Sequence, residues 1–497
     1  MLAFKSCIRR DPAEKPMSSH QDFVKADACA LVKQLRRGSI TPHQLLDAVE
    51  ARIAAVDGKV NALPTRCFDR ARANADRLMR RPPAERGLLA GLPIPIKDLT
   101  AVAGVRTTQG SPIYADHVPS SSDILVERLE SNGAIVYAKS NTSEFGAGAN
   151  TFNEVFGATR NPWDLSRSAA GSSGGAAAAL AAGTAWVAHG SDMAGSLRNP
   201  ASFCGVVGLR PSIGRVARTL AAKIDRTLSV QGPMARNVAD LALLLDAMTG
   251  EHPADPLSLP APAQSFFNAL HASPRPHRVA YSATLGISPV DPEVARITRA
   301  AAERLAEAGM VVEEAQPNLS EAHECFQILR AYDYVISKAA LLRRERDLLK
   351  PEIIWNIEKG LKLSLEDLER AEAQRVAISA RVLEFFKNYD LLLTPATIVA
   401  AFPVDQRYLV ECAGTTFNNY FEWLAIAYAI TLACCPALSL PCGFTTEGLP
   451  VGLQIVAPPR AEASILAGAK LLEDILGLSQ LTPIEPRTTA KHEAKIA

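Results

Sequence analysis

Residues 166–216 read SRSAAGSSGGAAAALAAGTAWVAHGSDMAGSLRNPASFCGVVGLRPSIGRV, which is the most distinctive pattern in the chain. An Ala-rich segment, Gly174–Gly183, follows a Gly/Ser cluster, and the apolar run Trp186–Ala188 comes soon after it. A flexible Gly/Ser linker is not followed at once by such residues. Glycines between regular elements permit close backbone approach and often accompany amides that bind an anion. The stretch therefore predicts a helix and a strand joined by tight turns of functional interest.

Helical and strand patterns alternate on both sides of this stretch. Thr41 and Pro42 suit the cap and the first position of a helix. Further helices are predicted at Ala28–Arg37, Asp69–Arg81, Ile124–Asn132, Val238–Met248, Pro292–Ala308, Ala461–Ile475 and over much of 320–390. Strands are predicted at Gly91–Lys97, Ala134–Ala138, Arg278–Tyr281, Val311–Glu314, Asp390–Thr394, Leu438–Cys442 and Leu449–Val456, and strand signals are weak between Ala188 and Val238. The alternation predicts an α/β fold with a large mixed, mostly buried central sheet covered by helices on both faces.

Composition excludes several classes of protein. The net charge is +1 and no basic block stands out, so no nucleic-acid partner is expected and a small molecule is the expected partner. Nine cysteines form no C-x-x-C pair, which argues against a disulfide framework or a zinc ribbon and favours a cytoplasmic location. No cluster of His, Cys and Asp suggests a metal, and no cofactor is expected.

Two stretches without Asp, Glu, Lys or Arg, Ser168–Ser191 and Trp423–Thr446, are long enough to cross a bilayer. Glycines interrupt the first, and Pro436 and Pro441 interrupt the second. We therefore expect buried helices or strands and no membrane partner.

Two serines are candidates for a catalytic nucleophile. Gly171–Gly175, GSSGG, matches the G-x-S-x-G elbow of α/β hydrolases and would assign Ser173. That elbow requires an apolar strand directly before it, and Arg160–Ala170 does not read as one. No later histidine has a distinctive setting, and His189 reads as a core residue of a buried strand. The other candidate is Ser196, in DMAGSLR at 192–198.

Around Ser196 the chain resembles the amidase signature enzymes. The segments that carry the resemblance are GLPIPIKD (91–98), KSNTSEFG (139–146), FGATRNPWDLSRSAAGSSGG (156–175), GSDMAGSLRNPASFCGVVGLRPS (190–212), CPALSLPCGF (435–444) and GLPVGLQIV (448–456). They extend the resemblance over about residues 25–476. The resemblance implies a serine amidohydrolase.

The resemblance also implies the roles of individual residues. The resemblance implies that Ser196 is the nucleophile and that Lys97 is the base. It also implies that Ser172, which follows a cis peptide bond, transfers the proton between them. The implied oxyanion hole consists of the backbone N–H groups of Met193, Ala194, Gly195 and Ser196. The implied supporting network is Ser173, Ser191, Asp192 and Arg198. Two departures from the family pattern are Met193-Ala194, where Thr-Gly is usual, and Ala170, where Gly is usual; activity is still expected if the backbone dihedrals are allowed for Ala.

These residue types suit cleavage of an amide. A serine hydroxyl is a weak nucleophile until a base takes its proton. Lys97 can be that base only when neutral, and burial beside Ile94 and Ile96 would lower its pKa. Taken singly, Lys97 could be a surface lysine, Ser172 a turn serine and Ser196 a helix cap, but the surrounding motifs favour the triad.

The substrate is less well determined by the sequence. Residues 320–425 correspond to the variable, substrate-shaping region of the family, and Tyr332, Trp355, Phe417 and Tyr420 are its candidate pocket residues. Aromatic side chains there would favour an aryl or apolar amide or a carbamate, although the same residues could be helix core. One alternative is the glutamine-hydrolysing subunit of a tRNA-dependent amidotransferase, a branch that carries Asp where this chain has Leu424. Another is a non-catalytic binding protein.

The domain prediction is one amidase domain over 20–486. It comprises a helical N-terminal part (20–85), a catalytic core (86–220) and the variable region. Residues 1–19 and 487–497 are predicted to be a disordered arm and tail. A homodimer is possible by resemblance.

Overall fold

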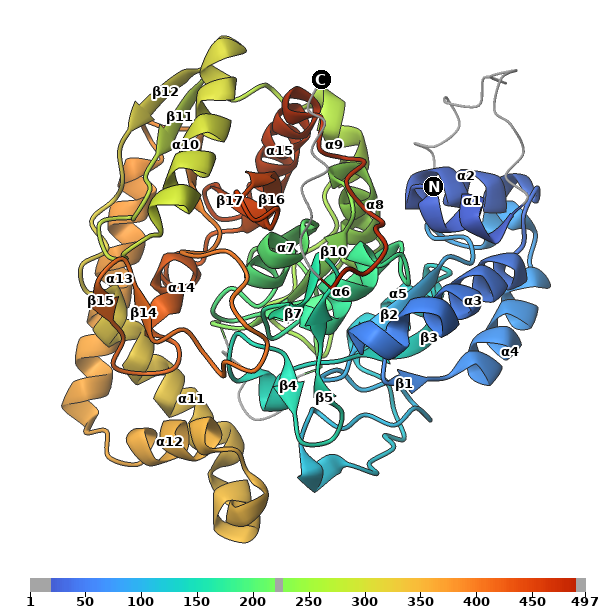
Figure 1. The fold of residues 1–497 in the computed structure, drawn as a ribbon, viewed down its shortest axis with the longest axis horizontal. Helices are drawn as coiled ribbons and strands as arrows, with labels where there is room; N and C mark the ends of the chain where they lie inside the picture. Colours follow the sequence, from blue (N-terminus) through green and yellow to red (C-terminus); the bar gives the residue numbers. More distant parts are fainter. Residues whose placement is uncertain (1–18, 220–226, 489–497) are drawn as a thin grey trace.

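The computed structural model describes residues 19–219 and 227–488, so most of the predicted N-terminal arm and C-terminal tail lies outside the described residues. The α-helices are α1 (His20–Lys25), α2 (Ala28–Arg37), α3 (Pro42–Val60), α4 (Phe68–Met79), α5 (Ile124–Ser131), α6 (Gly174–Ala181), α7 (Arg198–Cys204), α8 (Val238–Met248), α9 (Phe266–Ala272), α10 (Pro292–Glu307), α11 (Ala322–Glu345), α12 (Pro351–Gly360), α13 (Leu365–Phe385), α14 (Ala425–Leu432) and α15 (Glu462–Leu476). Figure 1 shows them surrounding a central sheet.

Strands alternate with these helices along the chain. They are β1 (Thr65–Arg66), β2 (Pro93–Lys97), β3 (Ile135–Ser140), β4 (Phe152–Asn153), β5 (Gly157–Ala158), β6 (Arg160–Asn161), β7 (Asp164–Ser168), β8 (Val187–Asp192), β9 (Val207–Arg210), β10 (Val230–Ala235), β11 (Arg278–Tyr281), β12 (Val311–Glu314), β13 (Leu391–Pro395), β14 (Glu411–Cys412), β15 (Thr415–Thr416), β16 (Ala437–Phe444) and β17 (Pro450–Val456).

Eight strands form one mixed sheet in the order β12-β11-β13-β17-β16-β9-β10-β8. Strand β11 is parallel to β12 and β13, and the other neighbours are antiparallel. Helices α7, α8, α10 and α15 pack against its strands, and the strands from β13 to β8 are largely buried. The predicted α/β fold with a large, mixed, mostly buried sheet is confirmed.

A second sheet, of order β1-β3-β2, places Lys97 near the end of β8. Strand β2 is parallel to β3, and its last residue is Lys97. The backbone N–H of Lys97 donates to His189 Nδ1 on β8 at 3.3 Å, so the two sheets meet beside this lysine. Strand β2 contains Pro93 and Pro95, which suits a strand with a ladder on one side only, because proline has no N–H to donate.

Local sequence signals explain several element boundaries. Thr41 caps α3 by accepting from the Gln44 backbone N–H, and the Gln44 side chain accepts from the Thr41 N–H in return. Pro42 occupies the first helical position, as predicted. Helix α8 has the predicted bounds. Strands β9 and β10 were not predicted, because glycines and Pro233 obscure the strand signal there.

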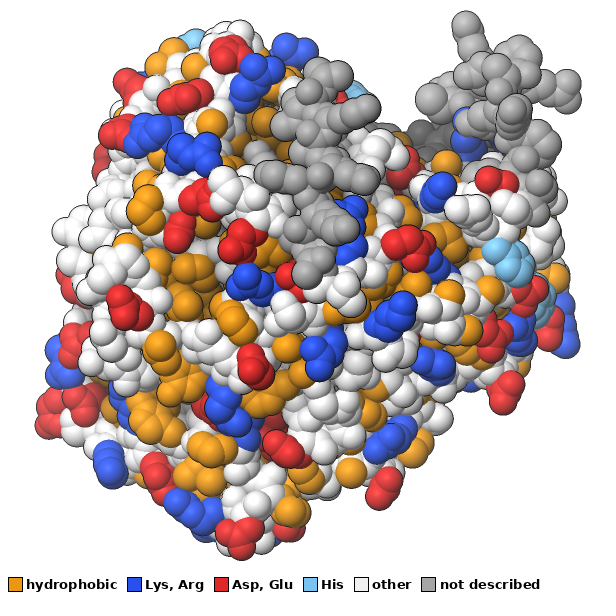
Figure 2. Space-filling model, in the orientation of Figure 1, with side chains coloured by type: hydrophobic (Ala, Val, Ile, Leu, Met, Phe, Trp, Pro, Cys, Tyr) orange, Lys and Arg blue, Asp and Glu red, His pale blue; other side chains and the backbone are white. Residues whose placement is uncertain are grey.

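The two uncharged stretches are buried inside the fold. Ser168–Ser191 contains all of α6 and most of β8, and Trp423–Thr446 contains α14 and β16. Within 19–219 and 227–488, no helix is both long and apolar enough to cross a membrane. On the face in Figure 2, acidic and basic side chains are interspersed, in keeping with the small net charge.

Candidate active site

Lys97 lies at the centre of a cluster of serine hydroxyls. Its ammonium nitrogen Nζ is 2.8 Å from Ser172 Oγ, 2.8 Å from Ser173 Oγ and 3.1 Å from Ser191 Oγ. The side chain is completely buried at the end of β2. The predicted base, the predicted shuttle and two predicted supporting residues are therefore brought into direct contact.

Burial changes the protonation of this lysine. Desolvation lowers the pKa of the Lys97 ammonium to about 7, although the Asp192 carboxylate nearby favours the charged form. A solvated lysine keeps its proton at neutral pH. A substantial fraction of Lys97 is therefore neutral near pH 7 and able to accept a proton from a serine.

Ser172 lies in the turn that leads into α6, and the Gly171–Ser172 peptide bond is cis. Glycines let other segments approach this turn closely: a Cβ on Gly175 would lie 2.4 Å from the backbone nitrogen of Asn141. Ala170 has φ of +55°, in the left-handed region that favours glycine. The residue at position 170, where the family usually has Gly, is Ala in this chain. The backbone there still has the left-handed conformation, which costs about 1–2 kcal/mol for a residue with a Cβ.

Ser196 lies between β8 and α7, 9% exposed, where it faces two cavities. Its carbonyl accepts from the Ser173 N–H at 3.2 Å, which joins the segment of Ser196 to that of Ser172. Among the described residues, the Ser196 hydroxyl has no hydrogen-bond partner. Catalytic hydrogen bonds are often long without substrate and shorten in the complex. Ser173, the elbow candidate, is buried and lines neither cavity.

The backbone amides before Ser196 differ in what they bind. The Gly195 N–H donates to Asp192 Oδ1 at 3.0 Å, so this member of the predicted oxyanion hole already has an acceptor. Within the described part of the chain, the N–H groups of Met193, Ala194 and Ser196 have no acceptor. Gly195 has φ of +98°, and a Cβ there would lie 2.5 Å from the Asn199 side chain. The turn therefore needs glycine at 195 but accommodates alanine at 194.

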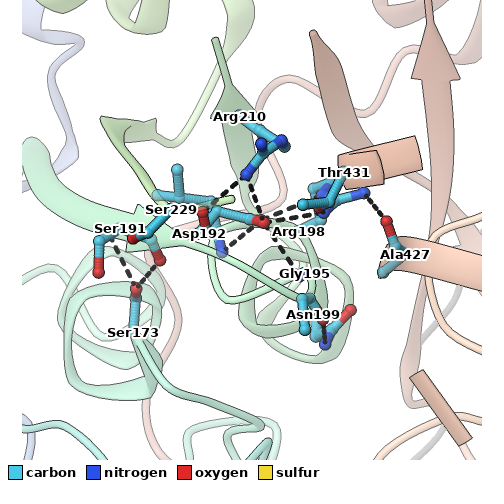
Figure 3. A network of polar contacts seen from close by, with 12 residues as sticks. Ser173, Ser191, Asp192, Gly195, Arg198, Asn199, Arg210, Ser229, Ala427 and Thr431 are labelled. Carbon is cyan, nitrogen blue, oxygen red and sulfur yellow. Dashed lines mark hydrogen bonds and ion pairs between the residues drawn. The ribbon is translucent and has the colours of Figure 1, made fainter. Parts of the chain in front are cut away.

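Asp192 anchors this turn through two buried arginines (Figure 3). Arg198 donates to both carboxylate oxygens, Nε to Oδ2 at 3.0 Å and Nη2 to Oδ1 at 2.8 Å. Arg210 Nη1 donates to the Asp192 carbonyl at 2.7 Å and lies 3.4 Å from Oδ1. Burial alone would raise the pKa of Asp192, but the charge and hydrogen bonds of Arg198, with Arg210, hold it well below its usual value. The carboxylate therefore stays ionised and fixes the backbone that carries Ser196.

Replacing Asp192 with Asn is expected to lower the free energy of unfolding by about 3–5 kcal/mol, because it leaves Arg198 and Arg210 buried without a counter-charge. Urea denaturation of the variant and the wild type measures this loss. The matched control is Asp47→Asn, which breaks the partly exposed ion pair with Arg72 (2.7 Å) and should cost less than about 1 kcal/mol. Equal stability of Asp192→Asn and the wild type would contradict the anchoring role.

His189 is buried in β8 beside the lysine, as expected of a core residue. Its Nδ1 accepts from the Lys97 backbone N–H, so the proton of this ring is on Nε2. Burial and the charge of Lys97 lower the pKa of His189 to about 3. The ring is therefore neutral near pH 7 and positions β2 against β8.

Two cavities meet at Ser196. The larger, of about 430 Å³, is lined by Ser172, Ser196 and other hydroxyl-bearing residues together with Leu99, Phe145 and Tyr334. The smaller, of about 20 Å³, is lined by Gly146, Gly148, Met193, Ala194, Ser196, Arg330, Phe421 and Leu424. Gly146, Met193 and Ser196 line both cavities, so a substrate carbonyl at Ser196 would lie where the two cavities meet.

The structure does not bring the four candidate pocket aromatics to these cavities: Tyr332, Trp355, Phe417 and Tyr420 line neither of them. Trp355 lies at a separate surface hollow with Lys359 and Lys362. Tyr420 is buried, where its hydroxyl accepts from Asn356 Nδ2 at 2.5 Å and its ring stands edge-on to Phe421. Position in the sequence alone could not reveal which aromatic side chains of this region line the cavities at Ser196.

Sequence reasoning missed two residues of the site, Arg210 and Arg330. Arg210 lies in GLRPS, at the end of a quoted family segment, but β9 was not predicted and its partner Asp192 could not be inferred. Arg330 lies in the middle of α11, where an arginine normally reads as a surface residue. Only the tertiary packing of α11 shows that it reaches the small cavity.

Comparisons with known proteins agree with this geometry. A family model described as Amidase matches residues 44–466. The chain is 35% identical to an acylamidase of Rhodococcus erythropolis, over 95% of this chain and 100% of that protein. It is 38% identical to a subunit of the Glutamyl-tRNA(Gln) amidotransferase of Moorella thermoacetica, over 88% of this chain and 94% of that protein.

Solved structures are similar over nearly the whole chain. A bacterial aryl acylamidase belonging to the amidase signature enzymes gives a TM-score of 0.86 at 26% identity, covering 92% of this chain and 97% of that one. A 6-aminohexanoate cyclic dimer hydrolase complexed with substrate gives 0.85 at 28% identity, covering 94% and 99%.

Proposed function

The chain belongs to the amidase signature family and is an enzyme that hydrolyses carbon–nitrogen amide bonds, and from that premise we propose a mechanism through an acyl-enzyme on Ser196. The observation that carries the proposal is the buried Lys97 in hydrogen-bond contact with Ser172, which lines the same cavity as Ser196. Burial leaves Lys97 able to take a proton near neutral pH.

In the proposed acylation, Lys97 takes a proton from Ser172 as Ser172 takes one from Ser196. Ser196 Oγ then attacks the carbonyl carbon, and the N–H groups of Met193, Ala194 and Ser196 stabilise the oxyanion. The Gly195 N–H, which donates to Asp192, is left out of this proposed oxyanion hole. Ser172 gives a proton to the leaving amine as the C–N bond breaks and regains one from Lys97, which is again neutral.

Deacylation repeats the same steps with water as the nucleophile. The triad takes a proton from water, the hydroxyl adds to the ester carbonyl, and Ser196 leaves with its proton restored. The products are an amine and a carboxylic acid. Each step uses groups that already contact one another or face the same cavity.

We propose an aryl or apolar amide or a carbamate as the substrate and a cytoplasmic location. Similarity to an acylamidase and to an aryl acylamidase supports the substrate class. The larger cavity offers Leu99, Phe145 and Tyr334 to an aryl amine. All eight described cysteines are free, which supports a reducing compartment.

The alternative function is glutamine hydrolysis within a tRNA-dependent amidotransferase, favoured by the similarity to a component of such an enzyme. Leu424, which replaces the Asp of that branch, lines the small cavity beside Ser196. Among the described residues, no carboxylate lines this cavity to pair with the α-amino group of glutamine. This observation makes amide hydrolysis without a partner the better-supported function.

The experiment that tests the proposal is product release from a panel of anilides, aliphatic amides, aryl carbamates, a fatty amide and glutamine. Turnover of an anilide or a carbamate is expected, and rapid acid quenching followed by peptide mass spectrometry should find the acyl group on the peptide that contains Ser196. Turnover of glutamine alone would favour the amidotransferase reading. An acyl group on Ser173 would overturn the proposed nucleophile.

A further inference from the structure

A second buried lysine, Lys139, lies close to the site and is not used by the proposed mechanism. It belongs to β3, which pairs with β2, and its side chain is completely buried. Its Nζ donates to the Thr100 carbonyl at 2.7 Å and to Thr107 Oγ1 at 2.7 Å, and it lies 3.3 Å from Asp98 Oδ1. Asp98 directly follows Lys97 in the sequence. Lys139 therefore joins β3 to the segment that continues from the proposed base.

The two buried lysines differ in what their partners can donate. Lys97 contacts three serine hydroxyls, each of which can donate or accept a hydrogen bond. The carbonyl and the carboxylate around Lys139 only accept, and Thr107 Oγ1 already donates to the Val105 carbonyl at 3.0 Å. A neutral amine would point its lone pair at one of these acceptors, whereas an ammonium group offers a proton to each. The contacts of Lys139 therefore require its protonated form.

The groups around Lys139 are consistent with a charged pair. Asp98 Oδ2 accepts from the Thr108 N–H at 3.1 Å and from the Thr108 hydroxyl at 2.5 Å, as an ionised carboxylate does. Desolvation lowers the pKa of Lys139 to about 8, and Asp98 favours its charged form. The other titratable groups near Lys139 are Cys67 and His189. Both are neutral near pH 7, because burial raises the pKa of the thiol to about 11 and lowers the pKa of the ring to about 3.

Asp98 and Lys139 together close a loop, residues 98–110, that forms one wall of the larger cavity. The Gln109 N–H donates to the Asp98 carbonyl at 3.0 Å, which brings the two ends of the loop together. Four residues of the loop line the cavity that Ser172 and Ser196 also line: Leu99, Thr100, Ala101 and Gln109. The position of this wall relative to the two serines therefore depends on how the loop is held.

The loop 98–110 also supports neighbouring parts of the same wall. The Asp123 N–H donates to the Ala101 carbonyl at 3.0 Å, and the Phe145 N–H donates to the Gln109 carbonyl at 2.8 Å. Asp123 and Phe145 both line the larger cavity. A displacement of the loop would therefore be passed to two further segments that face the cavity.

We propose that Asp98 and Lys139 are positioning residues: their ion pair holds the loop 98–110 where it forms the substrate-binding wall of the larger cavity. The inference rests on the proposed function, in which the substrate occupies the cavity lined by Ser172 and Ser196. Neither Asp98 nor Lys139 lines that cavity, so the pair acts on substrate binding through the loop and takes no part in proton transfer. A purely structural pair would lower stability without a specific effect on binding.

The first test is the Asp98→Asn variant, which keeps the shape of the side chain and an acceptor for Thr108 but removes the charge. For 4-nitroacetanilide, KM should rise at least about 10-fold and kcat should change by no more than a few fold, because the wall moves while Lys97 keeps its serine partners. The rise of the acylation rate through about pH 7 should stay where it is. An unchanged KM, or a loss confined to kcat, would overturn the proposal.

The matched control is Asp57→Asn. Asp57 is also a buried carboxylate, which accepts from the Ala62 N–H at 2.8 Å and lies 3.4 Å from Arg66, but it lines neither cavity. Its replacement should leave KM unchanged, and thermal unfolding curves compare the stability of the two variants. An equal rise of KM in Asp57→Asn would indicate general loosening of the fold and overturn the positioning role.

A double-mutant cycle tests whether the two residues act as a pair. Lys139→Met removes the other charge with a side chain of similar length and should also raise KM at least about 10-fold. The double variant, Asp98→Asn with Lys139→Met, should have a KM no higher than either single variant, because it leaves no buried charge without its partner. Effects that multiply in the double variant would show independent roles and overturn the pair.

Hydrogen exchange separates this inference from the catalytic proposal, because it needs no substrate. At about pH 7, backbone amides of 98–110 should exchange at least about 10-fold faster in Asp98→Asn than in the wild type, while those of α8 are unchanged. This result would support the hold of the pair on the loop even if no amide in the panel were hydrolysed. Unchanged exchange in 98–110 would overturn the proposal, whatever the hydrolysis rates are.

Discussion

Replacing Ser196 with Ala is expected to lower kcat/KM for any hydrolysed amide by about 10⁴-fold or more. In the proposed mechanism the variant lacks the oxygen that forms the acyl ester, so the covalent route is lost, and only binding and the oxyanion donors remain to assist water. The hydroxyl has no hydrogen-bond partner among the described residues, so its removal leaves no buried group unpaired, and the fold should be unaffected. Steady-state rates on the best anilide, with a thermal unfolding curve, measure both expectations.

The neighbouring Ser173→Ala variant is the matched comparison. Ser173 is the nucleophile in the α/β-hydrolase interpretation, whereas here its hydroxyl binds Lys97 at 2.8 Å and lines neither cavity. Its loss is expected to cost about 10-fold, because Lys97 keeps Ser172 and Ser191 as partners. A larger effect for Ser173→Ala than for Ser196→Ala would reverse the assignment of the nucleophile.

Replacing Lys97 with Met is expected to lower the acylation rate by about 10³-fold, within the contribution of a positioned base. Methionine is of similar length and tolerates the buried site, but it cannot accept a proton. Single-turnover kinetics isolates this step. The control is Lys387→Met, which removes an exposed lysine paired with Glu384 and should leave the rate unchanged.

The pH profile of wild-type acylation reports on the same lysine. The pKa of Lys97 is lowered to about 7 by burial, so the neutral, proton-accepting form is scarce at pH 6 and dominant at pH 8. The acylation rate should therefore rise with pH through about 7 and level off above it. His189 titrates near pH 3 and contributes nothing in this range. A flat profile from about pH 6 to 9 would contradict Lys97 as the base.

Much of the fold follows from local sequence signals. The cap Thr41 and the apolar run Leu391–Leu393 predict a helix start and a buried strand, because caps and apolar runs are properties of neighbouring residues. Strand β10 (VQGPMA) was not visible, since Gly232 and Pro233 weaken its local preference. Pairing with β8 and β9 overrides that preference.

The same distinction applies to the candidate site: sequence motifs predict some of its residues, and tertiary packing determines the others. Lys97, Ser172 and Ser196 could be assigned because they lie within long motifs that resemble a known family. The commitment of the Gly195 N–H to Asp192 and the approach of Arg330 to Ser196 depend on tertiary packing. The four candidate aromatic residues of 320–425 illustrate the limit. Tyr332 and Trp355 lie in α11 and α12, whereas Phe417 and Tyr420 lie outside the helices, and which side chains face a cavity depends on how these segments pack.

Two cavities of different size meet at Ser196, and this arrangement implies an order for the steps of the proposed reaction. In the proposed mechanism the amine departs after acylation, while the acyl group is still held on Ser196, which lines both cavities. Water then enters through the space that the amine has left, and the acid is the last product to leave. The enzyme should therefore follow ping-pong kinetics, and an added amine nucleophile that enters the vacated cavity should compete with water for the acyl group.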